Sequence, residues 1–289
     1  MGLKTTNVEN WIEIDETYLV KYQLKRKVYQ EHWDEAVAVL PGCGEGAFEA
    51  LELLKETLVR RYPTMFKLLE PHLIHNLVTG DVWDLSSDAS TWEKHHPLEI
   101  MGLLATDDFF LLFNDAETGE TTLRAAATCF PAGFKIEERI GQSLWGIHAG
   151  KVPQYESKLA KSMDRFFQRL KVGSVVSRFN YAIDDSDELF HRRSHHNLSL
   201  PEGDDPKLSD LHLRVERQVL QRLPKTRALL FTIRTYVTPI TEVTKDREVA
   251  AALRTSVNSY TDDVAKYKNK NVWDKLLQKH LSEILDIDE

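Results

Sequence analysis

The sequence predicts an α+β protein in which an antiparallel sheet carries helices packed on one face. Three segments of strand-like composition, residues 175–183, 211–220 and 228–237, follow one another with only loops or turns between them. Strands joined in this way pair antiparallel, because a parallel pair needs a longer crossover connection. Residues 45–61 and 155–170 carry apolar side chains at helical spacing, and they supply the helices that cover the sheet.

The N-terminal part of the chain predicts a strand followed by a helix. Apolar and polar residues alternate through residues 11–29, which is typical of a half-buried strand or a hairpin. Residues 45–61 instead repeat at helical spacing, and Pro63 stands beyond the end of the predicted helix. Its apolar stripe consists of Phe48, Leu51, Leu54 and Leu58.

A hairpin and a second helix follow. Residues 100–113 are apolar, and the polar run 114–119 separates them from the strand-like residues 121–126, which is a hairpin signal. Residues 155–170 predict a helix that Gly173 caps. Its inward side chains are Leu159, Met163, Phe166, Phe167 and Leu170.

The second half of the chain predicts the main strands and a helical C-terminus. Pro224-Lys225-Thr226 makes a turn between the last two strands, and the polar residues 186–209 form a long surface loop. Beyond Ile240 the apolar spacing predicts helices, the last with Trp273, Leu276, Leu277, Leu281 and Ile284 on one side. We therefore expect one domain over residues 1–240 and a C-terminal helical extension, residues 241–289, packed on it.

Composition excludes several classes of partner. The chain has 289 residues, 42% of them hydrophobic, and a net charge of −8. A nucleic-acid partner requires a concentrated positive surface, and the basic runs at 25–27 and 60–61 are too short to form one. No apolar run approaches the roughly 18 residues of a membrane span, and no signal peptide is visible. We expect a cytoplasmic protein with no membrane and no nucleic-acid partner.

One histidine stands at the end of an apolar row. At helical spacing Ile136, Ile140, Leu144 and His148 fall on one i, i+4 row. A flat apolar cofactor with a central metal needs such a face, with one imidazole nitrogen projecting from it. The alternative is a core histidine whose two ring nitrogens are satisfied by backbone groups.

A glycine-rich segment offers a nucleotide site as an alternative. Residues 42–47 match G-x-G-x-x-A and precede the helix at 45–61, as in a pyrophosphate-binding turn. Pro41 interrupts the strand-to-turn transition, however, and Pro63 breaks the crossover before a second strand appears. A glycine-rich helix start without a ligand explains the same residues.

Other metal-binding candidates are weaker. His191, His195 and His196 have spacing that could hold zinc, but the positive charges of Arg192 and Arg193 oppose a cation there. Cys129 could in principle be a thiolate ligand, although Phe130-Pro131 after it suggests a buried strand end. The two cysteines, Cys43 and Cys129, cannot supply the four thiolates of an iron–sulfur cluster.

A row of polar side chains lies on predicted strands. Arg178 and Asn180 share one face of a strand, and Arg214, Glu216 and Gln218 share one face of the next. Inward polar side chains are costly unless they bind one another or a ligand. They therefore form either a structural ion-pair network or a binding site.

Six short segments occur in a fixed order and carry a family resemblance. They are Cys129-Phe130-Pro131; Glu138-Arg139-Ile140-Gly141; Ile147-His148 with Val152-Pro153-Gln154-Tyr155; Arg178-Phe179-Asn180-Tyr181; Leu213-Arg214-Val215-Glu216-Arg217-Gln218 with Arg222-Leu223-Pro224; and Phe231-Thr232-Ile233-Arg234-Thr235-Tyr236. Over about residues 11–240 the chain resembles the catalytic subunit of haem-dependent oxidative N-demethylases. It departs from the family pattern after His148, where Gly150 and Lys151 stand between Ala149 and Val152.

The resemblance implies a PAS-like, haem-binding domain over residues 1–240 and a set of site residues. The cofactor would be haem b, with His148 as the iron ligand. Arg214 and Arg234 would bind the cofactor, an arginine of this kind holding a propionate. The catalytic residues would be Arg178, Asn180 and Glu216, which polarise dioxygen or anchor a cationic amine.

The activity implied is that of a monooxygenase. It would oxidise a methyl group of a small secondary amine such as dimethylamine with dioxygen, releasing formaldehyde and the primary amine. Because the chain has neither a convincing nucleotide site nor enough cysteines for a cluster, electrons would come from a separate reductase that carries flavin and an iron–sulfur centre. The alternative function is a haem-binding sensor or carrier that uses the same pocket without turnover.

Overall fold

The structure, a computed structural model, describes residues 2–87, 92, 94–115, 117–192 and 207–286. Within them a seven-stranded antiparallel sheet has the strand order β1-β8-β9-β10-β6-β7-β2. The predicted α+β class is confirmed. The strands are β1 (Lys4–Thr6), β2 (Val37–Val39), β6 (Asp108–Asn114), β7 (Thr121–Ala127), β8 (Val175–Asp184), β9 (His212–Arg222) and β10 (Leu229–Pro239).

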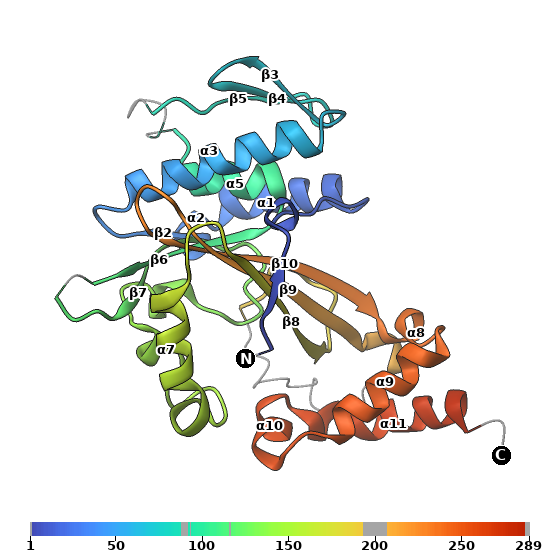
Figure 1. Cartoon of the computed structure of the whole chain (residues 1–289). Helices are drawn as coiled ribbons and strands as arrows, with labels where there is room; N and C mark the ends of the chain where they lie inside the picture. The colour runs from blue at the N-terminus through green and yellow to red at the C-terminus, as the bar shows by residue number, and fades with distance from the viewer. Residues whose placement is uncertain (1, 88–91, 93, 116, 193–206, 287–289) are drawn as a thin grey trace.

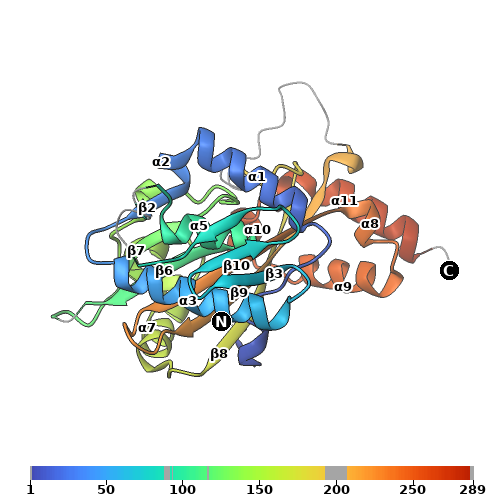
Figure 2. The same cartoon turned by 90° about the horizontal axis from the view of Figure 1, so that it is seen from above.

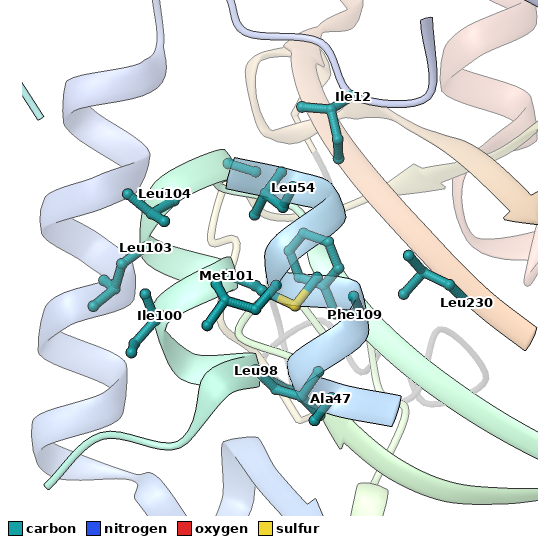
Figure 3. Close-up of a cluster of buried hydrophobic side chains, with 14 of the residues drawn as sticks. Ile12, Ala47, Leu54, Leu98, Ile100, Met101, Leu103, Leu104, Phe109 and Leu230 are labelled. Carbon is teal, nitrogen blue, oxygen red and sulfur yellow. The ribbon is translucent and has the colours of Figure 1, made fainter. Parts of the chain in front are cut away.

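A thick layer of helices covers one face of this sheet. It consists of α1 (Tyr18–Glu31), α3 (Gly44–Arg61) and α5 (Pro97–Ala105), with the short α2 (Trp33–Ala36) beside α1, as Figures 1 and 2 show. A small antiparallel sheet of β3 (Phe66–Glu70), β4 (Leu73–Asn76) and β5 (Val82–Asp84) lies outside it. Figure 3 shows the core between these helices and the main sheet, where Leu54 of α3 and Met101 of α5 lie near Phe109 of β6 and Leu230 of β10.

A smaller helical layer covers part of the opposite face. It contains α6 (Leu144–His148), a π-helical turn at Tyr155–Leu159, and α7 (Ala160–Arg169). The predicted helix at 155–170 is therefore confirmed in outline. This layer packs on the sheet through a second apolar cluster that includes Met163, Leu220 and Leu229. The sheet thus separates two cores, and the sequence pattern had anticipated only one helical face.

The first predicted strand is wrong, because Tyr18–Glu31 is the helix α1. Its buried positions recur every three or four residues, which is the helical period. Two of these buried positions are lysines, Lys21 and Lys25, so the sequence shows no continuous apolar stripe at helical spacing. Lys25 is buried because its ammonium pairs with Asp108 and donates to the Asp107 carbonyl, 2.8 Å away.

The predicted hairpin is confirmed, but its first strand, β6, is shorter than the apolar run at residues 100–113 from which it was predicted. Residues 100–105 of that run belong to α5 (Pro97–Ala105), which ends at Thr106 in the left-handed conformation (φ 62°). Strand β6 begins only at Asp108 and pairs with β7, Phe110 lying opposite Ala126. An apolar run buried on every side has no period that separates helix from strand.

The long strands and the C-terminal helices follow the prediction. β8, β9 and β10 occupy the three predicted strand segments, with the turn at residues 224–226. Beyond them lie α8 (Ile240–Val243), α9 (Arg247–Asn258), α10 (Asp262–Tyr267) and α11 (Lys270–Leu285). Trp273, Leu277 and Leu281 of α11 are buried in a third cluster with Ile183 and Leu211. Of the predicted loop at 186–209, residues 193–206 lie outside the described residues.

Among the described residues, no helix combines the length and the apolar composition needed to cross a bilayer.

Candidate functional site

His148 is the last residue of α6, which differs from the helix that the sequence predicted. The predicted row of four residues is broken, because Gly141 is left-handed (φ 80°) and Ser143 forms a bridge with Thr122 of β7. Before the break, Ile136–Glu138 is only a 3₁₀ turn. The new helix starts at Leu144, and the Ser143 hydroxyl accepts a hydrogen bond from the Gly146 amide. Leu144 and His148 therefore share one short helix.

The imidazole of His148 is oriented by its own helix. Nδ1 lies 2.7 Å from the carbonyl oxygen of Leu144, and because a carbonyl can only accept, Nδ1 carries the hydrogen. The ring of Tyr155 stacks on it with centroids 5.0 Å apart and an interplanar angle of 19°. The lone pair is therefore on Nε2, which has no hydrogen-bond partner among the described residues. A hydrogen bond from one ring nitrogen to a backbone carbonyl fixes the tautomer in which the other nitrogen of a histidine can bind a metal.

Burial and nearby charge keep this imidazole neutral. Desolvation lowers the pKa of His148 below its ordinary value of 6.5, and the positive charges of Arg178 and Arg139 lower it further. A neutral imidazole is the form that binds a metal. Of the two alternatives for His148, the structure satisfies one ring nitrogen through the backbone and leaves the other available.

The surroundings of His148 are apolar. Leu144 and Ile136 are buried in the cluster on this face, and Phe110 of β6 meets the rings of Phe134 and Phe231 with centroids 5.7 Å apart in each pair. Ile140, Ile147, Val152 and Ile233 pack against the same cluster. Three of the six motif segments, those at residues 138–141, 147–155 and 231–236, thus contribute to this cluster.

Two arginines bring positive charge to this apolar region. Arg178 of β8 is half-buried, and its Nε donates to Oε1 of Gln218 at 2.7 Å. Arg139 has its Nε and Nη1 atoms buried without a hydrogen-bond partner among the described residues, near the ring of Phe134. A buried guanidinium without a partner is costly. An anionic group bound here would remove that cost.

The predicted catalytic residues lie together on β8 and β9. The sheet register places Asn180 opposite Glu216 and Arg178 opposite Gln218. The Glu216 carboxylate accepts hydrogen bonds from Nδ2 of Asn180 at 3.3 Å and from Nε2 of Gln218 at 2.9 Å. Desolvation lowers the pKa of the half-buried Arg178, and the negative charge of Glu216 opposes part of this effect. The structure therefore brings Arg178, Asn180 and Glu216 into one hydrogen-bonded group.

The segment after α10 approaches the same group. The Lys268 ammonium donates to the carbonyl of Tyr181, and the negative charge of Glu216 acts on this lysine. At the start of α10, Asp263 accepts a hydrogen bond at 3.0 Å from Gln154, in the loop that follows His148. The C-terminal extension is thus connected both to the polar group and to the His148 loop.

Arg214 is already occupied by the protein. Its side chain is 1% exposed and donates to the carbonyl of Phe130 at 3.0 Å and to those of Leu189 and Glu188 at 3.3 Å each. Asp184 lies 4.0 Å from it. These contacts hold the segment that leads from β7 to residue 134 against the sheet. Both Nη atoms of Arg214 are thus occupied by the protein, and only its Nε lacks a partner among the described residues.

The structure does not bring Arg234 to His148. Side chains alternate along β10, so Arg234 lies on the face opposite Phe231 and Ile233, towards α1 and α5. There it is fully buried and pairs with Asp15 at 2.6 Å and Asp107 at 3.1 Å. We therefore leave Arg234 out of the candidate site. Its place in a motif reflects folding of the helical layer.

The remaining sequence candidates find structural explanations. His191 is buried against Asp184, at 3.1 Å, while His195 and His196 lie outside the described residues. Burial raises the pKa of Cys129 to about 12, so it is a thiol and a poor metal ligand. No group of three or more histidine, cysteine or acidic residues suited to a metal ion occurs among the described residues.

The glycine-rich segment at the start of α3 is explained by packing. A Cβ on Gly46 would lie 2.8 Å from the Phe113 ring, closer than any real Cβ contact. The helix can therefore approach the β6–β7 hairpin only with glycine at this position. This favours the interpretation without a nucleotide.

Sequence reasoning missed three residues of the site. Arg139 and Tyr155 lie inside the motif segments, but their roles depend on burial and on ring stacking, which spacing does not reveal. Gln218 was placed on the polar face without a role, and the structure makes it the link between Arg178 and Glu216. The usable signal was the i, i+2 spacing on two adjacent strands.

Fold and site together define a class: an α+β protein with one available imidazole nitrogen on an apolar face, flanked by arginines and by a polar group. Residues 2–278 match a family model described as haem-dependent oxidative N-demethylase, alpha subunit-like. The chain belongs to this family, which confirms the resemblance carried by its six segments. The family name indicates dependence on haem and an oxidative activity of the N-demethylase type.

Proposed function

We propose that the chain is a haem b monooxygenase that demethylates a small secondary amine such as dimethylamine. The observation that carries the proposal is the state of His148, whose Nδ1 is bound to Leu144, whose Nε2 has no partner among the described residues, and whose neighbours Leu144 and Tyr155 belong to an apolar cluster. One imidazole on an apolar face is what a haem requires of its protein ligand. The balanced reaction consumes the secondary amine, dioxygen, two electrons and two protons, and yields the primary amine, formaldehyde and water.

The residues around His148 fit the chemical features of haem. A haem is a flat apolar ring with two carboxylates, and the partnerless Nε and Nη1 of Arg139 would hold one of these by charge-assisted hydrogen bonds. Arg178 lies close enough for its charge to lower the pKa of His148 and is the second candidate. When bound, the haem would supply the redox chemistry with dioxygen.

The polar group on β8 and β9 would bind the amine. A carboxylate has about four lone-pair sites, and Glu216 uses two of them for Asn180 and Gln218. The remaining sites can accept N–H groups of a protonated amine. Gln218 holds Arg178 and Glu216 at fixed positions, so that the guanidinium and the carboxylate are both oriented before the substrate binds.

Glu216→Gln is expected to keep the haem and to weaken amine binding about tenfold or more, since it removes the charge that balances a bound cation. Spectral titration of the haem-loaded protein with dimethylamine measures this, and thermal unfolding measures stability. The control is Glu242→Gln, an exposed residue paired only with Lys245. If amine affinity is unchanged and only the melting temperature falls, Glu216 belongs to a structural network.

Turnover is expected to require an external electron donor. Given NADPH, dioxygen and dimethylamine, the haem-loaded chain should release no formaldehyde above the background of a protein-free reaction. Addition of a reductase that carries flavin and an iron–sulfur centre should raise release at least tenfold. Formaldehyde is measured by derivatisation, and NADPH-driven release by the isolated chain would contradict the proposed separate reductase.

The second candidate function is a haem-binding sensor or carrier, because the same site can hold haem without turnover. Absorption spectra of the purified protein, oxidised and reduced, with and without amine, separate the proposals. The monooxygenase predicts a Soret band that shifts when dimethylamine is added. A band indifferent to amine favours the sensor or carrier, and the absence of a Soret band after haem reconstitution refutes both.

A further inference from the structure

A cavity lies on the side of the main sheet away from His148, in the layer of α1, α3 and α5. It has a volume of about 750 Å³ and is lined by residues of α1, by the chain around β5, and by the start of α5. Figure 1 shows α1 and α5 on the side of the sheet opposite to α7. This volume is in the range of sites for small organic ligands. Neither the His148 face nor the proposed reaction uses it.

Aromatic side chains form much of the wall of this cavity. They are Tyr29 of α1, Trp33 of α2, Trp83 of β5, and Trp92. The rings of Tyr29 and Trp33 are tilted with centroids 6.1 Å apart. Trp83 meets His95 edge to face at 5.2 Å. Indole and phenol faces of this kind favour a planar aromatic ligand, because every such ring can stack on them.

Two N–H donors of the lining have no acceptor among the described residues. Trp83 has its indole Nε1 buried without a partner. His96 accepts the Leu98 amide hydrogen at Nδ1, 3.2 Å away, which puts its own hydrogen on Nε2. Burial lowers the pKa of His96 to about 4, so the ring is neutral at physiological pH. The buried Trp83 donor therefore lacks an acceptor such as a ligand carbonyl oxygen or ring nitrogen, and the Nε2 hydrogen of His96 can be donated to the same ligand.

One acceptor stands beside these donors. The Glu99 side chain is 9% exposed, lines the cavity, and receives a hydrogen bond from Nδ1 of His95 at 2.9 Å. Only Oε1 takes part in that contact. The carboxylate can therefore accept N–H groups from a ligand. A ligand whose edge carries N–H donors next to an acceptor could donate to Glu99 and accept from Trp83 and His96.

The rim of the cavity carries positive charge. Arg26, whose side chain is 48% exposed, and the exposed Lys94 both belong to the lining. The acid of the rim, Asp81, already accepts a hydrogen bond from the Tyr22 hydroxyl and lies 3.8 Å from Arg26. A ligand with an anionic substituent would meet Lys94 and Arg26 at the mouth. A cationic ligand would meet two cations and leave the ring donors unused.

From these features we infer that the cavity binds a planar nitrogen heterocycle with a lactam edge, an N–H group beside a carbonyl, and an anionic substituent. The ring stacks between the tryptophans, its N–H groups donate to Glu99, and its carbonyl accepts from Trp83 and His96. The anionic substituent lies at Lys94 and Arg26. Guanine carries such an edge, and adenine has no lactam N–H group.

Isothermal titration of the full chain with GMP tests the inference. AMP serves as the ligand whose base has a different hydrogen-bonding edge, and ribose 5-phosphate as the ligand without a base. GMP is expected to bind at least about tenfold more tightly than AMP, the usual discrimination of one paired hydrogen-bonding edge. Ribose 5-phosphate should bind weakly or not at all. Equal affinity for GMP and AMP would overturn the inference, and so would a ribose 5-phosphate affinity equal to that of GMP. The absence of GMP binding at about 1 mM ligand would also overturn it.

Two variants locate the binding. Trp83→Phe keeps an aromatic wall but removes the partnerless N–H, and Glu99→Gln keeps the size of the side chain but removes its charge. Each should weaken GMP binding about tenfold. Glu56→Gln, an exposed residue of α3, is the matched control. Circular dichroism checks folding, and if Glu99→Gln fails to fold, Trp83→Phe alone decides. GMP affinity unchanged in a folded Trp83→Phe variant would place the ligand elsewhere and contradict the inference.

Discussion

Replacing His148 with alanine is expected to abolish the wild-type haem spectrum. In the proposed site Nε2 of this residue is the iron ligand, with the tautomer fixed by the Leu144 carbonyl and the ring stacked on Tyr155. Without the imidazole, haem would be held only by apolar contact and by arginine. The Soret band of the reconstituted variant should disappear or shift to that of weakly bound haem, with at least a tenfold loss of affinity.

His72→Ala is the control for this variant. The His72 side chain is 45% exposed and belongs to the region of the small sheet, so its removal should leave the haem spectrum unchanged. Both variants should keep the wild-type circular dichroism, since His148 makes one backbone contact with its own helix. A His148→Ala protein with the full wild-type Soret band would refute the assignment of the ligand.

The second large effect is expected at Asp108, a buried carboxylate at the start of β6. Its carboxylate pairs with the buried ammonium of Lys25 and accepts from the Thr128 hydroxyl at 2.7 Å and from the amides of Cys129 and Phe130, at 3.0 Å each. It thereby fixes the end of β7 where the chain turns towards the His148 segment. Asp108→Asn leaves the Lys25 charge unbalanced and turns one acceptor oxygen into a donor.

Breaking a buried ion pair from one side costs about 3–5 kcal/mol of the free energy of unfolding. We expect a loss of this size for Asp108→Asn, measured by urea denaturation of the haem-free protein. Asp164→Asn, at an exposed position of α7, should change the same free energy by less than about 0.5 kcal/mol. A loss below about 1 kcal/mol for Asp108→Asn would mean that Lys25 finds another partner, and it would contradict the role assigned to this pair.

The fold was predictable where composition or burial leaves a local signal. β8, β9 and β10 coincide with three segments of strand-like composition separated by loops or turns, and α3 buries Leu51, Leu54 and Leu58 at helical spacing. α1 was not predictable in this way, because its buried face contains Lys21 and Lys25. The partner of Lys25, Asp108, is distant in the sequence. A long-range ion pair leaves no local pattern.

The candidate site was predictable in part for similar reasons. The i, i+2 spacing of Arg178 and Asn180 placed them on one face, and strand pairing brought Glu216 opposite Asn180. Spacing also placed Leu144 and His148 together, but it extended their helix through Gly141, which is left-handed and ends the preceding turn. It could not distinguish Arg234, which has its own carboxylates, from Arg139, which has buried nitrogens without a partner.

The central claim, that haem on His148 demethylates a secondary amine, is tested most directly by product analysis with hydrogen peroxide as the oxidant. Peroxide supplies one oxygen atom and accepts both electrons, so dimethylamine and peroxide give methylamine, formaldehyde and water without a reductase. The account predicts equal amounts of formaldehyde and methylamine from the haem-loaded protein, and only the level of free haem from His148→Ala. No formaldehyde above that level from the wild-type protein, or undiminished release by His148→Ala, would contradict it.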